Sequence, residues 1–385
     1  MHRRLMPRQI NRSPLPKSGH RLTLIVVFAR TKKRLCFDEK QGWGGTVRVP
    51  WKIRNASRLT GNYLAFVQNK MLGLFKAEMA GKHIVFACDF HGITGATIAI
   101  ARIANLLANK YRVSFAADPF SDYNVMLEKK VVIIPFKSLK KNKFDLYVCD
   151  GHMGLSFFSW LAERNRKSLL TIHGVLRKEN RLEKVHLASK SHLVGETQFM
   201  NHEVDQSRYF VIPNYCEKII KKRHANNVGI VGRLDDPNKN VPEALSIAKL
   251  SDAKEIHLWG GTDSRLPEGR VKYHAWTRNK NRIYDSFDVL ISMSKEESMG
   301  LTVIEAMSCG IPCVLADIPG FQVYKNCPGV ALVQMGDWEA AIGHVNRFLK
   351  KKAELKTGLV NHWDGHYSRH AVAEMWFREI EKLTS

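Results

Sequence analysis

From Met79 onward, short apolar runs typical of β-strands alternate with segments whose apolar residues recur at helical spacing. The alternation occurs twice. The first series predicts a helix at 96–107 and strands at 83–88, 113–117, 131–135, 146–149, 168–172 and 187–194. The second series predicts helices at 241–250, 280–287 and 302–308, and strands at 228–231, 255–259, 271–273, 289–292 and 312–315. Strands that alternate with helices favour a parallel sheet with right-handed crossovers. The sequence therefore predicts an α/β chain with two doubly wound, Rossmann-like domains.

Composition and turn residues suggest where these domains begin and end. The predicted parts are a basic N-terminal extension (1–78), a first Rossmann-like domain (79–217), a polar linker (218–227), a second Rossmann-like domain (228–366) and a C-terminal helix (367–385). Ligands of doubly wound sheets bind beyond the carboxyl ends of the strands. Two such domains that face each other are therefore expected to enclose a deep cleft.

The chain is strongly basic, with a formal net charge of +24, but this charge is unevenly distributed. Residues 1–79 hold 17 Lys and Arg against three Asp and Glu, so much of the excess lies in a separable segment. That distribution, and the lack of zinc-ligand spacing or a recognition-helix motif, argue against a nucleic-acid-binding protein. The seven cysteines contain no Cys-x-x-Cys pair, which favours reduced thiols in a cytoplasmic protein.

Residues 1–78 allow three interpretations. Between 59 and 75, apolar residues recur three and four apart, as on one face of a helix, and Lys70 and Lys76 flank them. This pattern fits a basic amphipathic helix on an anionic membrane, which would place the protein at the inner face of the cytoplasmic membrane. It also fits a helix packed in a core. Alternatively, the segment is translated sequence upstream of Met79. No apolar run approaches the ~20 residues that span a bilayer.

The most informative motif runs from Ser294 to Pro312. A predicted strand ends near Ser292, the following loop contains Glu297, and Gly300 leads into a helix that contains Glu305. The free amides of the first helical turn form a site for an anion such as phosphate. The side chain of Glu305 leans back toward that turn, where a ribose attached to the phosphate would lie. The simpler interpretation is a solvated loop glutamate and a glutamate favoured by the helix dipole.

The full string from Ser294 to Pro312 resembles the signature of retaining GT-B glycosyltransferases of family 4, in which seven residues separate the two glutamates. Two other stretches occur in the order that this family requires. Val231-Gly232-Arg233-Leu234 with Asn238-Lys239-Asn240 resembles its Gly-Arg-Leu…Lys-Gly element, with Asn240 in place of Gly. Ile212-Pro213-Asn214-Tyr215 resembles its Ile-Pro-Asn-Gly turn, with Tyr215 in place of Gly. The resemblance covers residues 80–385.

The resemblance implies a role for each matching residue. The second domain would bind the nucleotide-sugar donor, and the first domain would bind the acceptor. Glu297 and His173 would lie beside the transferred sugar as catalytic residues, and Asp150 and His152 would lie on the acceptor side. Both glutamates are expected to face the cleft, and neither is expected to fill a core. The residues implied in donor binding are Arg233, Lys239, Gly300, Leu301, Thr302, Glu305 and Gly95.

The implied reaction is transfer of a sugar, with retention, from a nucleotide-diphosphate sugar, in the first place a UDP-sugar. The implied acceptor is a glycan or a lipid-linked glycan of lipopolysaccharide or cell-surface polysaccharide synthesis. The chain contains no Asp-x-Asp, the usual clamp for a metal-bound nucleotide sugar, so neither a metal nor another cofactor is expected. The alternatives are a nucleotide-sugar 2-epimerase of the same build, a catalytically inactive scaffold, and the disfavoured nucleic-acid-binding protein.

Overall fold

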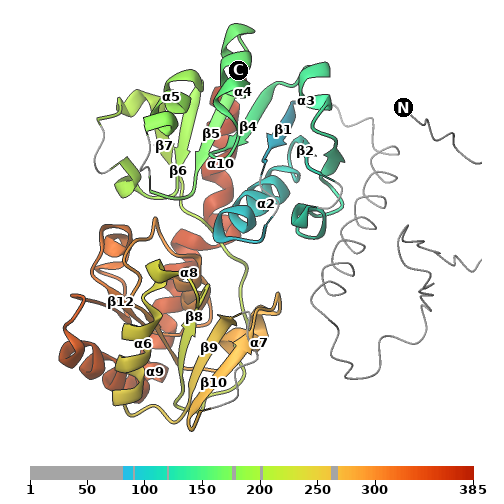
Figure 1. The fold of residues 1–385 in the computed structure, drawn as a ribbon. Helices are drawn as coiled ribbons and strands as arrows, with labels where there is room; N and C mark the ends of the chain where they lie inside the picture. Colours follow the sequence, from blue (N-terminus) through green and yellow to red (C-terminus); the bar gives the residue numbers. More distant parts are fainter. Residues whose placement is uncertain (1–80, 90–91, 119–120, 176–178, 200–202, 262–267) are drawn as a thin grey trace, which may run out of the picture. The chain divides into compact units, whose positions relative to one another are not determined.

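The computed structural model describes residues 81–385 except 90–91, 119–120, 176–178, 200–202 and 262–267. The three interpretations of the extension at 1–78 therefore concern residues that lie outside the described part of the chain. The described residues form two parallel sheets, each with helices packed on it (Figure 1). The predicted α/β class with two doubly wound domains is confirmed.

The first sheet has seven strands in the order β3-β2-β1-β4-β5-β6-β7, and every pairing between them is parallel. The strands are β1 (His83–Ala87), β2 (Arg112–Ala116), β3 (Val132–Ile134), β4 (Leu146–Asp150), β5 (Ser168–Ile172), β6 (Lys190–Leu193) and β7 (Tyr209–Val211). The helices between them are α2 (Gly95–Leu107), α3 (Ser138–Lys141), α4 (Leu155–Glu163) and α5 (Glu179–Leu187). The strand order reverses at β1, so the switch point lies between β1 and β4.

The second sheet has six parallel strands in the order β10-β9-β8-β11-β12-β13. They are β8 (Val228–Val231), β9 (Ile256–Gly261), β10 (Val271–Ala275), β11 (Val289–Ser292), β12 (Cys313–Ala316) and β13 (Val330–Val333). The helices are α6 (Val241–Leu250), α7 (Lys280–Tyr284), α8 (Leu301–Ser308) and α9 (Trp338–Tyr367). The switch point here lies between β8 and β11.

Most predicted elements are present, and the bounds of β5, β8, β11 and α6 agree with the prediction. The strand predicted at 187–194 is too long, because Leu187 is the last residue of α5 and β6 begins at Lys190. One short strand at the end of each sheet, β7 and β13, and the 30-residue helix α9 were not predicted.

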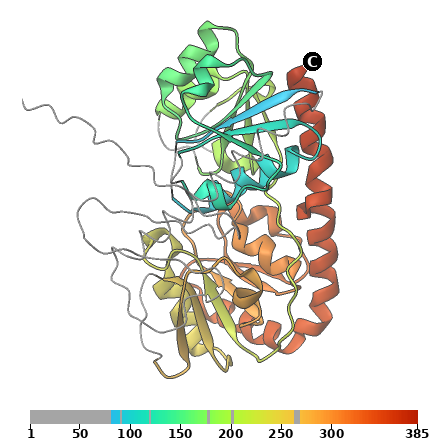
Figure 2. The same cartoon turned by 90° about the vertical axis from the view of Figure 1, so that its right-hand side faces the viewer.

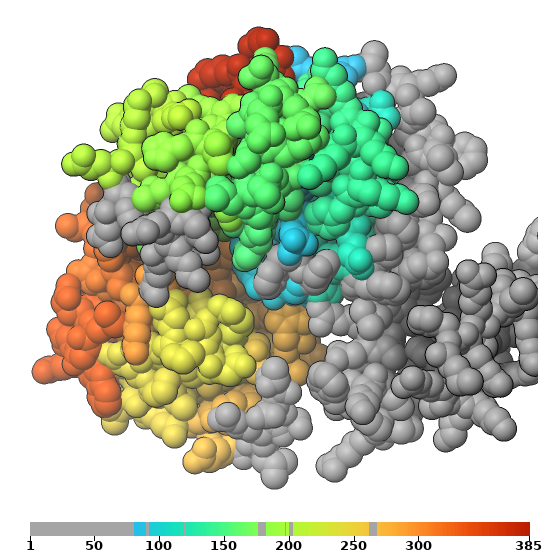
Figure 3. All heavy atoms as spheres, turned by 45° about the horizontal axis from the view of Figure 1, so that its top comes forward, coloured from blue at the N-terminus to red at the C-terminus, as the bar shows by residue number. Residues whose placement is uncertain are grey.

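The C-terminal helix α10 (Arg369–Thr384) completes the core of the first domain rather than that of the second. Its buried residues Val372, Trp376 and Ile380 pack in one cluster with α2 and β1. At its far end, Glu381 accepts hydrogen bonds from Lys82 (3.0 Å) and Tyr111 (2.8 Å). Figures 2 and 3 show this helix, in red, against the first domain. The chain therefore returns to the first domain after the second has been built.

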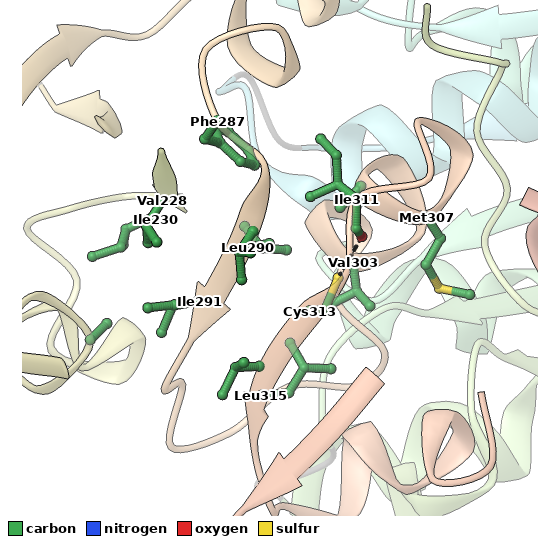
Figure 4. Packing of buried hydrophobic residues seen from close by; sticks show 14 of the residues in the cluster. Val228, Ile230, Phe287, Leu290, Ile291, Val303, Met307, Ile311, Cys313 and Leu315 are labelled. Carbon is green, nitrogen blue, oxygen red and sulfur yellow. Dashed lines mark hydrogen bonds between the residues drawn. The ribbon is translucent and has the colours of Figure 1, made fainter. Parts of the chain in front are cut away.

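The helix α8 is fixed to the second sheet through one face. Val303 and Met307, one helical turn apart, belong to the buried cluster that includes Leu290 and Cys313 (Figure 4). Glu305 lies two residues from each of them, which places its side chain on the opposite face of the helix. The packing of α8 on its own sheet therefore directs Glu305 away from that sheet.

Candidate functional site

A cavity of about 540 Å³ is lined by residues that follow the carboxyl ends of strands in both sheets. This is the position at which doubly wound sheets bind ligands. All eleven residues that the sequence singled out line this one cavity. They are Gly95, Asp150, His152, His173, Arg233, Lys239, Glu297, Gly300, Leu301, Thr302 and Glu305.

Two loops of the second domain carry the basic pair and Glu297. The loop after β8 contains Arg233, which pairs with Asp236, and Lys239, which donates to the carboxylate of Glu297. Asn238 ties the same two loops together, since its side chain donates to the Glu296 carbonyl (2.7 Å) and its carbonyl accepts from the Lys295 amide (2.8 Å). Arg233 is 65% exposed, so its guanidinium remains accessible to a ligand.

The structure accounts for Asn240, which replaces the glycine of the resembled motif. Asn240 has φ 47° and ψ 44°, a left-handed conformation that glycine adopts easily and that asparagine tolerates better than most residues. The turn between Lys239 and α6 is therefore preserved. Tyr215, the other departure, is buried, and its hydroxyl donates to the Arg102 carbonyl at 2.7 Å.

The start of α8 depends on a glycine. Gly300 has φ +77°, and a Cβ on it would lie 2.8 Å from Cε1 of Phe321. Gly300 is the N-cap residue of α8, and it has no side chain that could accept hydrogen bonds from the first amides of this helix. This leaves the helix start open to an anionic ligand such as a phosphate group.

The loop that carries Glu297 is held from both domains. Gly320 lies so close to it that a Cβ there would clash with the Glu297 carbonyl oxygen. From the first domain, the His173 carbonyl accepts a hydrogen bond from the Ser298 hydroxyl at 2.8 Å. The loop that carries Glu297 is therefore held in place by contacts from both domains. The close approach of Gly320 to this loop could not be predicted from the sequence.

Glu305 lines the cavity but differs from the expectation that it fills no core. Its side chain is 1% exposed, and it accepts hydrogen bonds from Arg102, Lys280 and Tyr284, each at 2.8 Å. Burial alone would raise the pKa of this carboxyl group, but the positive charges of Lys280 and Arg102 hold it below its usual range. That expectation was wrong, because two cations and a phenol make burial of the carboxylate possible.

His173, just after β5, has both ring nitrogens buried, with no hydrogen-bond partner for either in the described part of the chain. Burial lowers its pKa to about 4, so the imidazole is neutral at neutral pH. A buried polar group without a partner is costly. These nitrogens are therefore suited to hydrogen bonds with a ligand in the cavity.

Asp150, at the end of β4, organises the loop beside His173. Its Oδ1 accepts from the backbone amides of His152 (3.0 Å) and Met153 (3.2 Å). Its Oδ2 contacts His152 Nδ1 at 3.0 Å and accepts from the Cys88 thiol. Because Asp150 is buried and half of the His152 ring is exposed, the carboxylate positions the imidazole.

Comparison with known families identifies the second domain. Residues 225–351 match the family model described as "Glycosyl transferases group 1". This part of the chain is a group 1 glycosyltransferase domain. Seven of the eleven predicted residues lie within this domain: Arg233, Lys239, Glu297, Gly300, Leu301, Thr302 and Glu305.

Two of three curated relatives are glycosyltransferases by name, and the chain spans only a third to about half of the length of each of the three. The N-acetyl-alpha-D-glucosaminyl L-malate synthase of Bacillus anthracis is 28% identical over 37% of this chain and 33% of its own length. The O-antigen chain mannosyltransferase RfbU of Salmonella typhimurium is 25% identical over 42% and 51%. The poly(ribitol-phosphate) alpha-N-acetylglucosaminyltransferase of Staphylococcus aureus is 22% identical over 47% and 43%.

Solved structures confirm the fold over most of the described chain. Anabaena Alr3699/HepE in complex with UDP superposes with a TM-score of 0.67 at 16% identity, covering 78% of this chain and all of that one. The lipopolysaccharide outer core galactosyltransferase WaaB superposes with a TM-score of 0.61 at 16% identity, covering 78% and 99%. The group 1 domain is therefore the second half of a GT-B fold, as the sequence predicted.

Several residues that line the cavity were not predicted from sequence. In the group 1 domain they are Trp259, which stacks on His274 with ring centroids 4.0 Å apart, Trp276, and Lys280. In the first domain, Lys184 of α5 is buried and donates to the Gly151 carbonyl at 3.0 Å. The sequence singled out none of these residues, and their positions in the fold reveal them.

Two further features of the described residues concern metal ions and membranes. Within that part of the chain, no group of three or more His, Cys, Asp or Glu side chains could hold a metal ion. No helix among the described residues is both long enough and apolar enough to span a membrane.

Proposed function

We propose that this protein is a retaining glycosyltransferase that uses a nucleotide-diphosphate sugar, specifically a UDP-sugar. The main support is the convergence of all eleven predicted residues, from both domains, on one cavity of a GT-B fold. The UDP donor is supported by the Anabaena structures, which are complexes with UDP and with UDP-glucose.

In this proposal the second domain binds the donor. Arg233 and Lys239 contact the diphosphate, and the amides at the start of α8 add partial positive charge. Glu305 binds the ribose hydroxyls. These groups also stabilise the charge that develops on the departing nucleoside diphosphate, so neither a metal ion nor another cofactor is required.

The chemical step would occur on one face of the sugar. The bond between the anomeric carbon and the diphosphate oxygen breaks, and the acceptor oxygen bonds to the same face of that carbon. The acceptor proton passes to the departing phosphate oxygen, which preserves the balance of charge. Glu297 would stabilise the positive charge on the sugar, and neutral His173 would hold one of its hydroxyls.

The acceptor is proposed to be a glycan or lipid-linked glycan in lipopolysaccharide or cell-surface polysaccharide synthesis. Support comes from the relatives, whose names refer to the O-antigen and to poly(ribitol-phosphate). The basic residues at 1–79 would attach a cytoplasmic enzyme to the anionic inner face of the cytoplasmic membrane. His152, held by Asp150, would face the acceptor.

A thermal-shift panel of nucleotide sugars, with and without EDTA, tests this proposal. A ligand present at 100 times its dissociation constant stabilises a protein by about 2.7 kcal/mol. We expect stabilisation by UDP and by one or more UDP-sugars, unaffected by EDTA. A preparation that no nucleotide stabilises would contradict the proposal, and donor turnover without any acceptor would indicate an epimerase instead.

A further inference from the structure

The first domain contributes a cation to the group 1 domain. Arg102 lies on α2, and its Nη2 is 2.8 Å from Oε1 of Glu305 on α8, 203 residues further along the chain. Its Nη1 donates to the Tyr215 carbonyl, also at 2.8 Å. A guanidinium bound through two nitrogens to two fixed acceptors has little freedom of rotation.

The backbone around Arg102 is as well fixed as its side chain. The Tyr215 hydroxyl donates back to the Arg102 carbonyl at 2.7 Å, so the two residues bind each other twice. The first turn of α2 is closed by a capping box between Thr94 and Thr97. At that turn, a Cβ on Gly95 would be 3.6 Å from Leu301, so the starts of α2 and α8 lie in contact.

The two carboxylate oxygens of Glu305 have different surroundings. Oε2 accepts from Lys280 and from Tyr284, both on α7 of the same domain. Among the described residues, Oε1 accepts from Arg102 alone. A carboxylate oxygen can accept two hydrogen bonds, so Oε1 retains the capacity to accept one from a ligand in the cavity that Glu305 lines.

We propose that Arg102 is a positioning residue of the donor site, which orients Glu305 so that Oε1 accepts a hydrogen bond from a hydroxyl group of the donor's ribose. This inference rests on the proposed function, which assigns the ribose to Glu305. Because Arg102 belongs to the first domain, full donor affinity requires α2 and α8 to be in contact. Arg102 thus takes part in donor binding without itself touching the nucleotide.

The test uses the full-length chain and compares Arg102→Gln, Arg102→Lys and the control Arg164→Gln. Arg164 is an exposed first-domain arginine that pairs with its neighbour Glu163. Binding of UDP and of 2′,3′-dideoxy-UDP is measured by calorimetry, and donor KM and kcat are measured with a UDP-sugar. The dideoxy nucleotide lacks the ribose hydroxyl groups that would donate the proposed hydrogen bond. Measuring both nucleotides with the wild type and with Arg102→Gln therefore forms a double-mutant cycle.

We expect Arg102→Gln to weaken UDP binding about tenfold, equivalent to about 1.4 kcal/mol. Donor KM should rise by a similar factor while kcat changes little, because a ribose contact is the same in the ground and transition states. Arg102→Lys should recover part of the affinity. The wild type should prefer UDP to the dideoxy nucleotide about tenfold, and Arg102→Gln should lose most of that preference.

A structural role alone would lower thermal stability but leave the preference for UDP over the dideoxy nucleotide intact. If Arg102→Gln binds UDP as tightly as the wild type does, or keeps the full preference, the inference is overturned and the proposed function stands. If the wild-type chain binds no nucleoside diphosphate at all, the proposed function is overturned and this inference falls with it.

Discussion

Lys239 donates a hydrogen bond to the carboxylate of Glu297 and so joins the loop after β8 to the loop before α8. The sequence predicts separate roles for these residues, Lys239 at the diphosphate and Glu297 at the sugar. Their contact makes them a pair with opposite charges in the lining of the cavity. A bound diphosphate would share Lys239 with Glu297, so the two contributions should be coupled.

Glu297→Gln should chiefly lower kcat, because its negative charge matters most as the sugar becomes cationic. Its effect should also be non-additive with that of Lys239→Ala, since each variant removes one partner of the same ion pair. Steady-state kinetics of both single variants and of the double variant measure this coupling. A normal kcat for Glu297→Gln would show that the glutamate only supports the helix start.

Replacing both Arg233 and Lys239 by alanine should weaken binding of free UDP. Loss of a charged hydrogen-bond partner costs roughly 1.5–3 kcal/mol, so a decrease in affinity of at least tenfold is expected. Calorimetry measures the dissociation constant. The matched control replaces Arg347 and Lys350, two exposed cations on α9, and should bind UDP normally. Equal affinity of the two double variants would remove both residues from the phosphate site.

Glu305→Gln should destabilise the fold as well as raise donor KM. The neutral amide leaves Arg102 and Lys280 without their anionic partner in a buried network. We expect a loss of roughly 1–3 kcal/mol in the free energy of unfolding, measured by chemical denaturation. Unchanged stability would mean that the network contributes little, as the sequence had first suggested.

Gly300→Ala should disturb the start of α8, because alanine is strained at φ +77° and its methyl group would meet the Phe321 ring. A loss of roughly 1–3 kcal/mol in stability and weaker UDP binding are expected. The control is Gly343→Ala within α9, where a Cβ would meet nothing within 4 Å. That variant should be neutral or slightly stabilising. Equal melting temperatures would show that the conformation of Gly300 is not required.

Asp288 should make the second domain sensitive to acid. Burial alone would raise its pKa, but Lys221 and the amide of Ala225 are among the groups that lower it to about 2. A carboxyl group whose pKa is lower in the folded state than in the unfolded state stabilises the folded state at pH values above the unfolded-state pKa. This stabilisation is lost as the pH falls through the folded-state pKa. The stability difference between wild type and Asp288→Asn should therefore shrink between about pH 4 and pH 2. Denaturation curves across that range measure it, and a constant difference would contradict the prediction.

Sequence was sufficient for the parts of the fold and site that depend on local patterns. The strands β8 and β11 are continuous apolar runs, and the residues from Glu297 to Glu305 follow β11 in an extended motif. The position of the cleft then followed from the general rule that doubly wound sheets bind ligands beyond the carboxyl ends of their strands. The eleven predicted residues share a cavity for this reason.

Sequence was insufficient where a residue's environment depends on distant parts of the chain. The burial of Glu305 depends on Arg102, and nothing in either local sequence connects them. Gly320 looks like an ordinary turn residue, although its close approach to Glu297 requires a glycine. The strand β7 has only three residues, too few for a clear alternating pattern.

The position of α10 has a consequence for synthesis of the protein on the ribosome. Because Val372, Trp376 and Ile380 fill the core against α2 and β1, the first domain contains residues that are translated after the whole second domain. Its sheet and α2 can assemble early, but the buried cluster that they form stays incomplete until residues 369–384 have left the ribosome. The second domain, whose core is complete by Tyr367, can therefore reach its final packing before the first.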